Sequence, residues 1–301
     1  MPSDTLAAGR AFLEREGRLV ERRLAATLFD GAPAAGVIDA LRGYRNPDGG
    51  FGHGLEPDKR CPDSLPIDVE SAFEIMLVAG AVDEAMVLYA CDWLAEVAAP
   101  DGAVPLSFPV IEAHPRAEHW SEWTYVPGLN PTAGLAGRLH RMGVDHPWLD
   151  RATEWCWSRL GRGSGGVPQK DSGFDEDAHS LREVLLFLAH VPDRARAEAA
   201  GSSVGDWLAQ ARWYRADPDD PSYGVTPLDF APEPGGPWSH LFDDALIERH
   251  LDGLQRDQQA DGSWAITWEP PGTASTLEWR GMLTLWALRV LRAYGRLEAA
   301  G

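Results

Sequence analysis

Cysteine is scarce in this sequence of 301 residues, which contains only three. Cys61, Cys91 and Cys156 lie far apart, and none of them belongs to a C-x-x-C pair. A disulfide framework or a zinc ribbon requires several cysteines at defined spacings. The sequence therefore favours neither, and we interpret the three thiols as buried or incidental.

Positive charge is also in short supply, with 27 Lys and Arg against 46 Asp and Glu and a net charge of −19. A chain of this charge repels nucleic-acid phosphates and anionic membrane surfaces. No apolar run approaches the roughly 18 residues that a membrane span requires. The N-terminal segment carries charges every few residues and has no apolar core of a signal peptide. We therefore expect no nucleic-acid partner, no membrane span and a cytoplasmic location.

Apolar residues recur with a helical period along the chain, and convincing alternating strands are absent, which predicts an all-α protein. Turns rich in Gly, Pro and Asp separate the apolar segments. The order of helix, Gly turn and helix recurs about every 40 to 60 residues, a pattern typical of helical hairpins. The predicted helices cover residues 4–29, 33–45, 66–80, 84–98, 130–142, 147–160, 175–190, 193–213, 240–259 and 275–297.

The hairpins combine two kinds of helix. Segments 66–80, 175–190 and 275–297 are apolar on nearly all faces, which favours a buried position. Segments 84–98 and 147–160 keep a polar stripe, which favours an outer position. Because inner and outer helices alternate, we predict an α/α toroid of about six hairpins. We expect residues 1–301 to form a single domain.

Two turns carry a motif that is also found elsewhere. The stretch QRDQQADGSW at 255–264 resembles the Q-x-x-DG-x-W repeat of squalene-hopene cyclases and related terpenoid cyclases. NPDGGFG at 46–52 resembles the same turn there and in the β subunits of protein prenyltransferases. The resemblance implies the α/α toroid and, for function, an isoprenoid or other apolar substrate. From the residues alone, each turn is a structural clasp, because Gly permits a left-handed backbone and the aromatic residue packs back over it.

The same resemblance implies a place for a catalytic acid. Class II terpenoid cyclases carry D-x-D-D at the start of an inner helix, where this chain has Asp175, Glu176 and Asp177 without the final aspartate. We predict that this cluster protonates the substrate. Acids in a first helical turn are also ordinary capping groups, so a structural role stays open. The literal match DPDD at 217–220 lies in a Pro-rich stretch and is expected to be an exposed loop.

Polar residues near the N-terminal ends of inner helices should gather at the mouth of a toroid. The loop GHGLEPD places three polar residues close together, and such loop clusters often carry function. Aromatic faces nearby would stabilise a carbocation. Asn130 is also expected to cap the helix that follows it. The predicted substrate-binding residues are His53, Glu56, Asp58, Asn130, His179, Trp264, Glu278 and Trp279, and Asp68, Glu70 and Thr132 belong to the same set.

Protein prenyltransferases bind zinc through Asp, Cys and His on inner helices. Only Asp177 and His179 match part of that set and no cysteine is near them in sequence, so we predict no metal site. No cofactor is expected, except Mg²⁺ if the substrate is a diphosphate. The expected partner is an apolar small molecule, and a homodimer is one way to complete its pocket.

Three functions remain open at this point. The first is a terpenoid-cyclase-like enzyme that protonates an apolar substrate. The second is a carbohydrate-active (α/α) barrel enzyme that uses Glu56 with Asp177 or Glu278 as its pair of carboxylates. The third is a non-catalytic toroid that binds a ligand or a partner. The spacing of these residues in the sequence does not separate the three.

Overall fold

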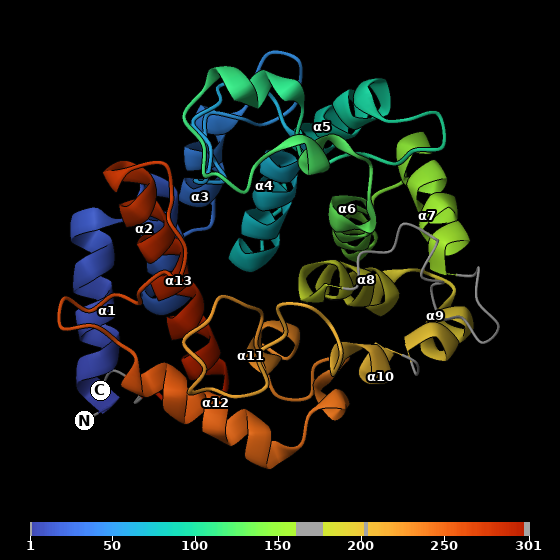
Figure 1. The fold of residues 1–301 in the computed structure, drawn as a ribbon. Coiled ribbons are helices and arrows are strands. Elements are labelled where there is room, and N and C mark those ends of the chain that lie inside the picture. Colours follow the sequence, from blue (N-terminus) through green and yellow to red (C-terminus); the bar gives the residue numbers. More distant parts are fainter. Residues whose placement is uncertain (1, 161–176, 202–203, 298–301) are drawn as a thin grey trace. The chain divides into compact units, whose positions relative to one another are not determined.

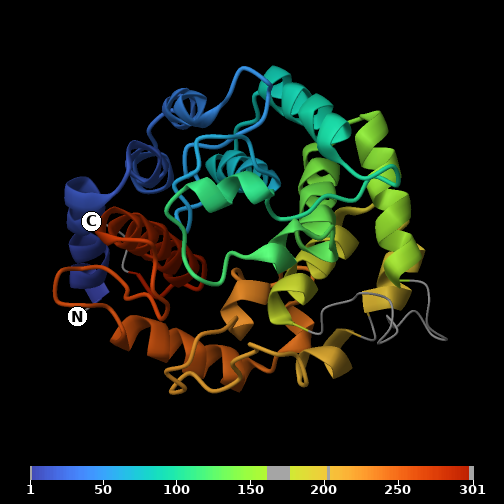
Figure 2. The same cartoon turned by 45° about the horizontal axis from the view of Figure 1, so that its top comes forward.

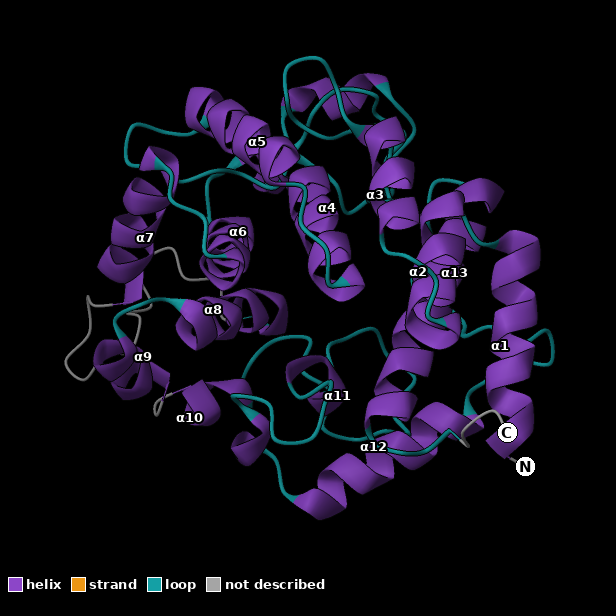
Figure 3. Cartoon of the chain, turned by 180° about the vertical axis from the view of Figure 1, so that it is seen from behind, coloured by secondary structure: helices purple, strands orange, loops and turns teal. Residues whose placement is uncertain are grey.

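The computed structural model describes residues 2–160, 177–201 and 204–297 (Figure 1). Figure 3 shows helices and loops but no strand in these ranges, which confirms the all-α prediction. The α-helices are α1 (Pro2–Glu16), α2 (Leu19–Asp30), α3 (Ala35–Leu41), α4 (Pro66–Ala79), α5 (Glu84–Val97), α6 (Leu129–Met142), α7 (Pro147–Leu160), α8 (Ala178–His190), α9 (Arg194–Gly201), α10 (Val204–Leu208), α11 (Pro227–Phe230), α12 (Asp244–Arg256) and α13 (Thr273–Ala293). Short 3-10 helices are η1 (Arg42–Tyr44), η2 (Pro109–Ala113), η3 (Glu122–Tyr125) and η4 (Ser239–Leu241).

The chain divides into two compact units. Unit 1 combines Met1–Ala40 with Trp213–Gly301, and unit 2 is Leu41–Arg212. Unit 1 therefore joins segments from both ends of the sequence, whereas unit 2 is continuous. That the whole chain behaves as a single domain stays a prediction.

Unit 2 contains two rows of helices (Figure 2). Helices α4, α6 and α8 form the inner row, and α5, α7 and α9 each pack on the outer side of one of them. Residues 68–70 of α4 are all buried, which places a wide part of this helix surface against its neighbours. On α5, by contrast, Tyr89 is 54% exposed. In this unit the predicted difference between inner and outer helices is confirmed.

In unit 1, α13 packs against α1, α2 and α12. The prediction of one helix over residues 4–29 is wrong, because α1 ends at Glu16 and α2 begins at Leu19. Arg18 between them has an extended backbone (φ −62°, ψ 163°). Its guanidinium binds the carboxylate of Glu21 at 2.6 and 2.9 Å, and both side chains are largely buried. This local ion pair stabilises the break.

The predicted helix 193–213 is also wrong as a continuous element. The described part contains α9 and α10, and α10 already ends at Leu208. Trp213 has a left-handed backbone (φ 64°), which an α-helix does not tolerate. Nearby, α11 is a short helix that the apolar periodicity does not predict, because four residues are too few to show a period.

The helix predicted over residues 240–259 is present, but it begins later than the apolar pattern indicates. Helix α12 starts at Asp244, because the Asp243 side chain accepts a hydrogen bond from the Leu246 N–H at 2.6 Å and caps the helix. The residues just before it form η4 instead. The apolar pattern thus identified the helix, and the capping residue set its start.

Three Gly turns share one hydrogen-bond pattern. The residue after the glycine makes two hydrogen bonds. Its carbonyl accepts from the N–H of the residue three positions before the glycine, and its own N–H donates to the side chain of the aspartate that precedes the glycine. The glycines have φ between 93° and 96°. The Gly turns that recur in the sequence therefore also share one backbone conformation. The turns cover residues 46–50, 99–103 and 259–263, closed by N–O distances of 2.9, 2.9 and 2.8 Å.

Each of these turns packs on the backbone of another helix. A Cβ at the central glycine would collide there, so only glycine permits the close approach. In the third turn, Trp264 is 5% exposed and its indole N–H donates to the Leu254 carbonyl at 2.8 Å. The stretch QRDQQADGSW is thus a clasp, as predicted. The contacts are Gly49 with Tyr89 of α5, Gly102 with Ala152 of α7, and Gly262 with Ala8 of α1.

Candidate functional site

Two groups of buried charged side chains lie beside α4. Asp68 and Glu70 are two residues apart on this helix and point about 200° apart around its axis. Asp68 contacts the loop that precedes α4, whereas Glu70 contacts α6. We call the first group, Glu56, Lys59 and Asp68, the loop cluster. We call the second, Glu70, Arg138 and Glu183, the helix cluster.

The loop cluster is arranged around Lys59, whose side chain is fully buried. Its Nζ lies 2.7 Å from Glu56 Oε2 and 3.3 Å from Asp68 Oδ2, so one ammonium faces two carboxyl groups. The ring of Trp120 covers the ammonium, with Nζ 4.8 Å from its centroid. Burial lowers the pKa of Lys59, but the charges of Asp68 and Glu56 outweigh it and the pKa is raised. Lys59 is therefore a fixed cation.

Glu56 uses its two carboxyl oxygens differently. Oε2 accepts from Lys59 and from the backbone N–H of Asp58 at 3.2 Å, whereas Oε1 accepts no hydrogen bond from the described residues. The backbone N–H of Glu56 donates to Asp68 Oδ1 at 2.7 Å, which fixes the loop on α4. Burial raises the pKa of Glu56 to about 7, although the charge of Lys59 opposes this. Near neutral pH this side chain can therefore gain and lose a proton.

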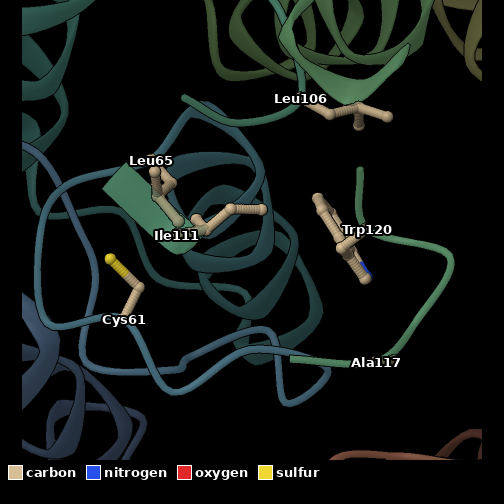
Figure 4. Close-up of a cluster of buried hydrophobic side chains, with 6 residues drawn as sticks. All are labelled: Cys61, Leu65, Leu106, Ile111, Ala117 and Trp120. Atoms are coloured by element: carbon tan, nitrogen blue, oxygen red, sulfur yellow. The ribbon is translucent and has the colours of Figure 1, made fainter. Parts of the chain in front are cut away.

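A long-range backbone pairing builds the loop cluster. Lys59 and Arg116 form an antiparallel bridge, and the hydrogen bonds on either side of it measure 2.8 Å. The pairing brings the segment around Trp120 onto the loop that carries Glu56. It also brings His119 Nε2 to 3.1 Å from Asp58 Oδ2. The paired segments also contribute to an apolar cluster, which consists of Cys61, Leu65, Leu106, Ile111, Ala117 and Trp120 (Figure 4).

The helix cluster joins the three inner helices of unit 2. Arg138 of α6 donates from Nη1 to Glu70 Oε1 of α4 at 2.9 Å and to Glu183 Oε2 of α8 at 2.8 Å. Its Nε binds Glu74 Oε2 at 3.1 Å. Gly134 lies directly against both carboxyl groups, and a Cβ there would overlap them. The small residues of LNPTAG therefore allow the close helix approach that the sequence indicates.

The two buried carboxyl groups of the helix cluster titrate differently. Burial, reinforced by the charge of Glu183, raises the pKa of Glu70 well above its ordinary value. At Glu183 burial favours a raised pKa, but the charges of Arg138 and Arg182 outweigh it and lower the pKa to about 2. A hydrogen bond joins the two carboxyl groups, and Glu70 holds its proton more tightly than Glu183 does.

The predicted acid cluster is described only in part. Asp175 and Glu176 lie outside the described residues. Asp177 is buried and caps α8, because its Oδ1 accepts from the backbone N–H groups of His179 and Ser180 at 2.8 and 3.1 Å. Its Oδ2 accepts from the Ser180 hydroxyl at 2.9 Å. Both oxygens of Asp177 thus have capping partners, and a catalytic role for Asp175, Glu176 and Asp177 stays a prediction.

The structure brings only some of the predicted binding residues together. Glu56 and Asp58 contact each other, whereas the exposed His53 has a left-handed backbone (φ 59°) and its Nε2 bonds Asn46 Oδ1 at 2.8 Å. Asn130 has an extended backbone inside α6, just before Pro131, and provides no capping hydrogen bond. Asn130 therefore occupies the N-cap position that the sequence predicts, with Pro131 as the first helical residue, but without the capping hydrogen bond. Helical geometry can start there because proline needs no N–H partner.

The remaining predicted residues are divided between the two units. His179 lies in the first turn of α8 in unit 2. In unit 1, Trp264 belongs to the clasp, and Glu278 and Trp279 are part of α13. The ring of Trp279 packs edge-on against Trp268, with centroids 4.9 Å apart. A substrate-binding role for these four stays a prediction.

Sequence reasoning did not single out three central residues of the two clusters. Lys59 had a usable signal, because Lys59 and Lys170 are the only lysines in a sequence that otherwise relies on arginine. Arg138 and Glu183 had none, since charged residues on a helix are usually solvated. Their burial depends on how α4, α6 and α8 pack, which no local pattern reveals.

Comparisons with known proteins bear on the fold. No protein-family model matches the sequence, and no curated protein matches it. A solved protein from Actinoplanes is similar in structure at 18% identity and a TM-score of 0.61, covering 98% of this chain and 100% of the other. The type II terpene cyclase MstE from Scytonema, in complex with geranylgeranyl dihydroxybenzoate, is similar at 11% identity and a TM-score of 0.56, with 97% of each chain covered.

The substrate-free form of that cyclase matches at 14% identity and a TM-score of 0.53, covering 98% of this chain and 99% of the other. At such identities the likeness shows the fold alone. This chain has the all-α fold of a type II terpene cyclase. The fold class predicted from the sequence is thereby confirmed. None of the described helices is long and apolar enough to cross a membrane.

Proposed function

We propose that this protein is a terpenoid-cyclase-like enzyme and that Glu56 is its proton donor. The supporting observation is the unequal use of the Glu56 oxygens, beside a fixed ammonium in a fold shared with a type II terpene cyclase. Oε2 is held by Lys59 and by the Asp58 N–H, so Oε1 is the oxygen that can carry the proton. A pKa of about 7 keeps about half of this acid protonated at neutral pH.

In the proposed step, the Oε1 proton adds to a carbon of a prenyl double bond. A C–H bond forms, the π bond breaks, and the neighbouring carbon becomes a cation that the next double bond attacks. The carboxylate left on Glu56 is stabilised by the two donors already bound to Oε2. Loss of a proton from another carbon ends the reaction, so the product is an isomer of the substrate.

The experiment uses geranylgeranyl dihydroxybenzoate, incubated with the full chain in D₂O. A cyclised isomer with one carbon-bound deuterium is expected, because the acid exchanges its proton with solvent before each turnover. The variant Glu56→Gln keeps the shape but loses the proton, and its turnover should fall by at least about 100-fold. Glu118→Gln, a change at an exposed carboxylate in the same unit, serves as the matched control.

Two outcomes would count against the proposal in different ways. If the wild type forms no cyclised isomer from prenyl substrates of several chain lengths, the cyclase function is wrong. If the wild type cyclises and Glu56→Gln is equally active, the function stands but the acid lies elsewhere. Asp177→Asn then tests the acid that the family resemblance implies.

A further inference from the structure

A group of metal-ligating side chains lies next to the loop cluster, in the same unit. The Sγ of Cys61, a carboxylate oxygen of Asp63 and a ring nitrogen of His114 all lie within 4.8 Å of one another. Cys61 Sγ is 3.6 Å from Asp63 Oδ2, and His114 Nε2 is 3.9 Å from the same oxygen. The proposed reaction makes no use of this group.

The backbone pairing explains why these residues meet. In the antiparallel bridge Lys59 lies opposite Arg116, and extending that register by two residues on each segment places Cys61 opposite His114. Directly opposite residues of an antiparallel pair project to the same face. Asp63, at a bend two residues after Cys61, brings its carboxylate to both side chains. The bridge and the bend together bring a thiol, a carboxylate and an imidazole into one place.

The distances are close to those of a bound metal ion. Tetrahedral zinc with ordinary bond lengths separates a sulfur and an oxygen ligand by about 3.6 Å, and a nitrogen and an oxygen ligand by about 3.3 Å. The first separation is already present, and the second requires a movement of less than an ångström. The side chains of Asp63 and His114 are 55% and 28% exposed, so they have room for that movement.

We propose that Cys61, Asp63 and His114 bind a Zn²⁺ ion. The mixture of one sulfur, one nitrogen and one oxygen ligand suits zinc, whereas Mg²⁺ and Ca²⁺ take oxygen ligands. Three protein ligands leave the fourth position open to solvent on the side of Asp63 and His114. On binding, the Cys61 thiol releases its proton to solvent and the thiolate joins the metal.

This site differs from the one that the prenyltransferase resemblance implies. Its ligands come from two paired loop segments and not from inner helices, and they include neither Asp177 nor His179. A bound ion would fasten the segment that carries Lys59 to the segment that carries Trp120. The site does not depend on the proposed cyclase function, and metal binding can be measured without any substrate.

The test uses the full chain, first stripped with EDTA, then incubated with ZnCl₂ and passed through a desalting column. About one zinc per chain is expected by elemental mass spectrometry, and competition with a coloured chelator gives the affinity. His114→Ala and Asp63→Asn should each weaken zinc binding by at least about tenfold. His240→Ala, at an exposed histidine in unit 1, should bind zinc like the wild type.

Cobalt provides a second readout that reports on the sulfur ligand. Co²⁺ in the same site should give a thiolate-to-metal charge-transfer band that Cys61→Ser abolishes and Cys91→Ser retains. Circular dichroism of each variant checks that it is folded. If Cys61→Ser does not fold, His114→Ala replaces it in this test. Loss of the charge-transfer band in folded His114→Ala then supports the proposed site. Wild-type protein that retains no more zinc than His114→Ala would overturn the proposal, as would a cobalt spectrum without the thiolate band.

Discussion

The loop cluster and the helix cluster contain the same chemical groups in different settings. Each has two carboxyl groups and one buried cation, but Lys59 is a compact point charge and Arg138 is a planar fork. Arg138 ties α4, α6 and α8 together and reaches Glu74 as well. The loop cluster leaves Glu56 Oε1 without a partner among the described residues. The helix cluster thus serves packing, and the loop cluster keeps an oxygen available for chemistry.

The largest effect is expected when the helix cluster is broken at its centre. Arg138→Met leaves the buried Glu183 with only the more exposed Arg182, 3.1 Å from its Oε1, and removing one partner of a buried ion pair costs about 3 to 5 kcal/mol. The free energy of unfolding in urea measures this loss. Arg256→Met, at an arginine whose ion pairs are exposed, should change that free energy little. Equal losses in both variants would show that the helix cluster adds no special stability.

The pH dependence of stability should have opposite signs in the two clusters. The pKa of Glu56 is raised from 4.5 to about 7. Its contribution to the free energy of unfolding is therefore complete below pH 4.5 and is lost as the pH rises through 7. That of Glu183 is lowered from 4.5 to about 2, so its contribution is present above pH 4.5 and is lost as the pH falls through 2.

Urea unfolding across this pH range tests the first sign. Relative to Glu56→Gln, the wild type should lose up to about 3 kcal/mol between pH 4.5 and 7, as the shift in pKa requires. Glu118→Gln should follow the wild type. A difference between wild type and Glu56→Gln that stays constant over this range would mean that Glu56 is not a protonated acid in the folded protein.

The smallest effect distinguishes the two glutamates that share Arg138. Burial raises the pKa of Glu70 and so favours its uncharged form, which Gln resembles, and Glu70→Gln should cost less than about 1 kcal/mol. Glu183→Gln removes the charge that faces the guanidinium and should cost about 2 to 3 kcal/mol. Comparing the two variants in the same urea titration measures the difference. The reverse order would place the proton on Glu183.

Local features of the fold could be predicted from the sequence. The start of α4 follows from Pro66 at its first position, and the turn at 259–263 follows from its Asp-Gly pair and Trp264. Both depend on residues that are neighbours in the chain. The break at Arg18 was missed because a helical period continues across it, although one extended residue and its ion pair with Glu21 suffice to stop the helix.

The candidate site could be predicted only in part. Glu56 and Asp58 stood out because they are close in sequence and lie in a loop. The role of Lys59 depends on Asp68 and on Trp120, which reaches it through the pairing with Arg116. Strand pairing of this kind between distant loops leaves no periodic pattern. Tertiary packing therefore decides which of the many acids in this chain can hold a proton.

The three Gly turns also affect the order in which the protein can fold during synthesis. The turns around Gly49 and Gly102 rest on α5 and α7, which follow them in the chain. The turn around Gly262 rests on Ala8 of α1, which precedes it in the chain. Helix α1 contacts α2, but it is synthesised long before α13 and the Gly262 turn that also pack on it. Until those segments are synthesised, α1 lacks part of its packing on the nascent chain.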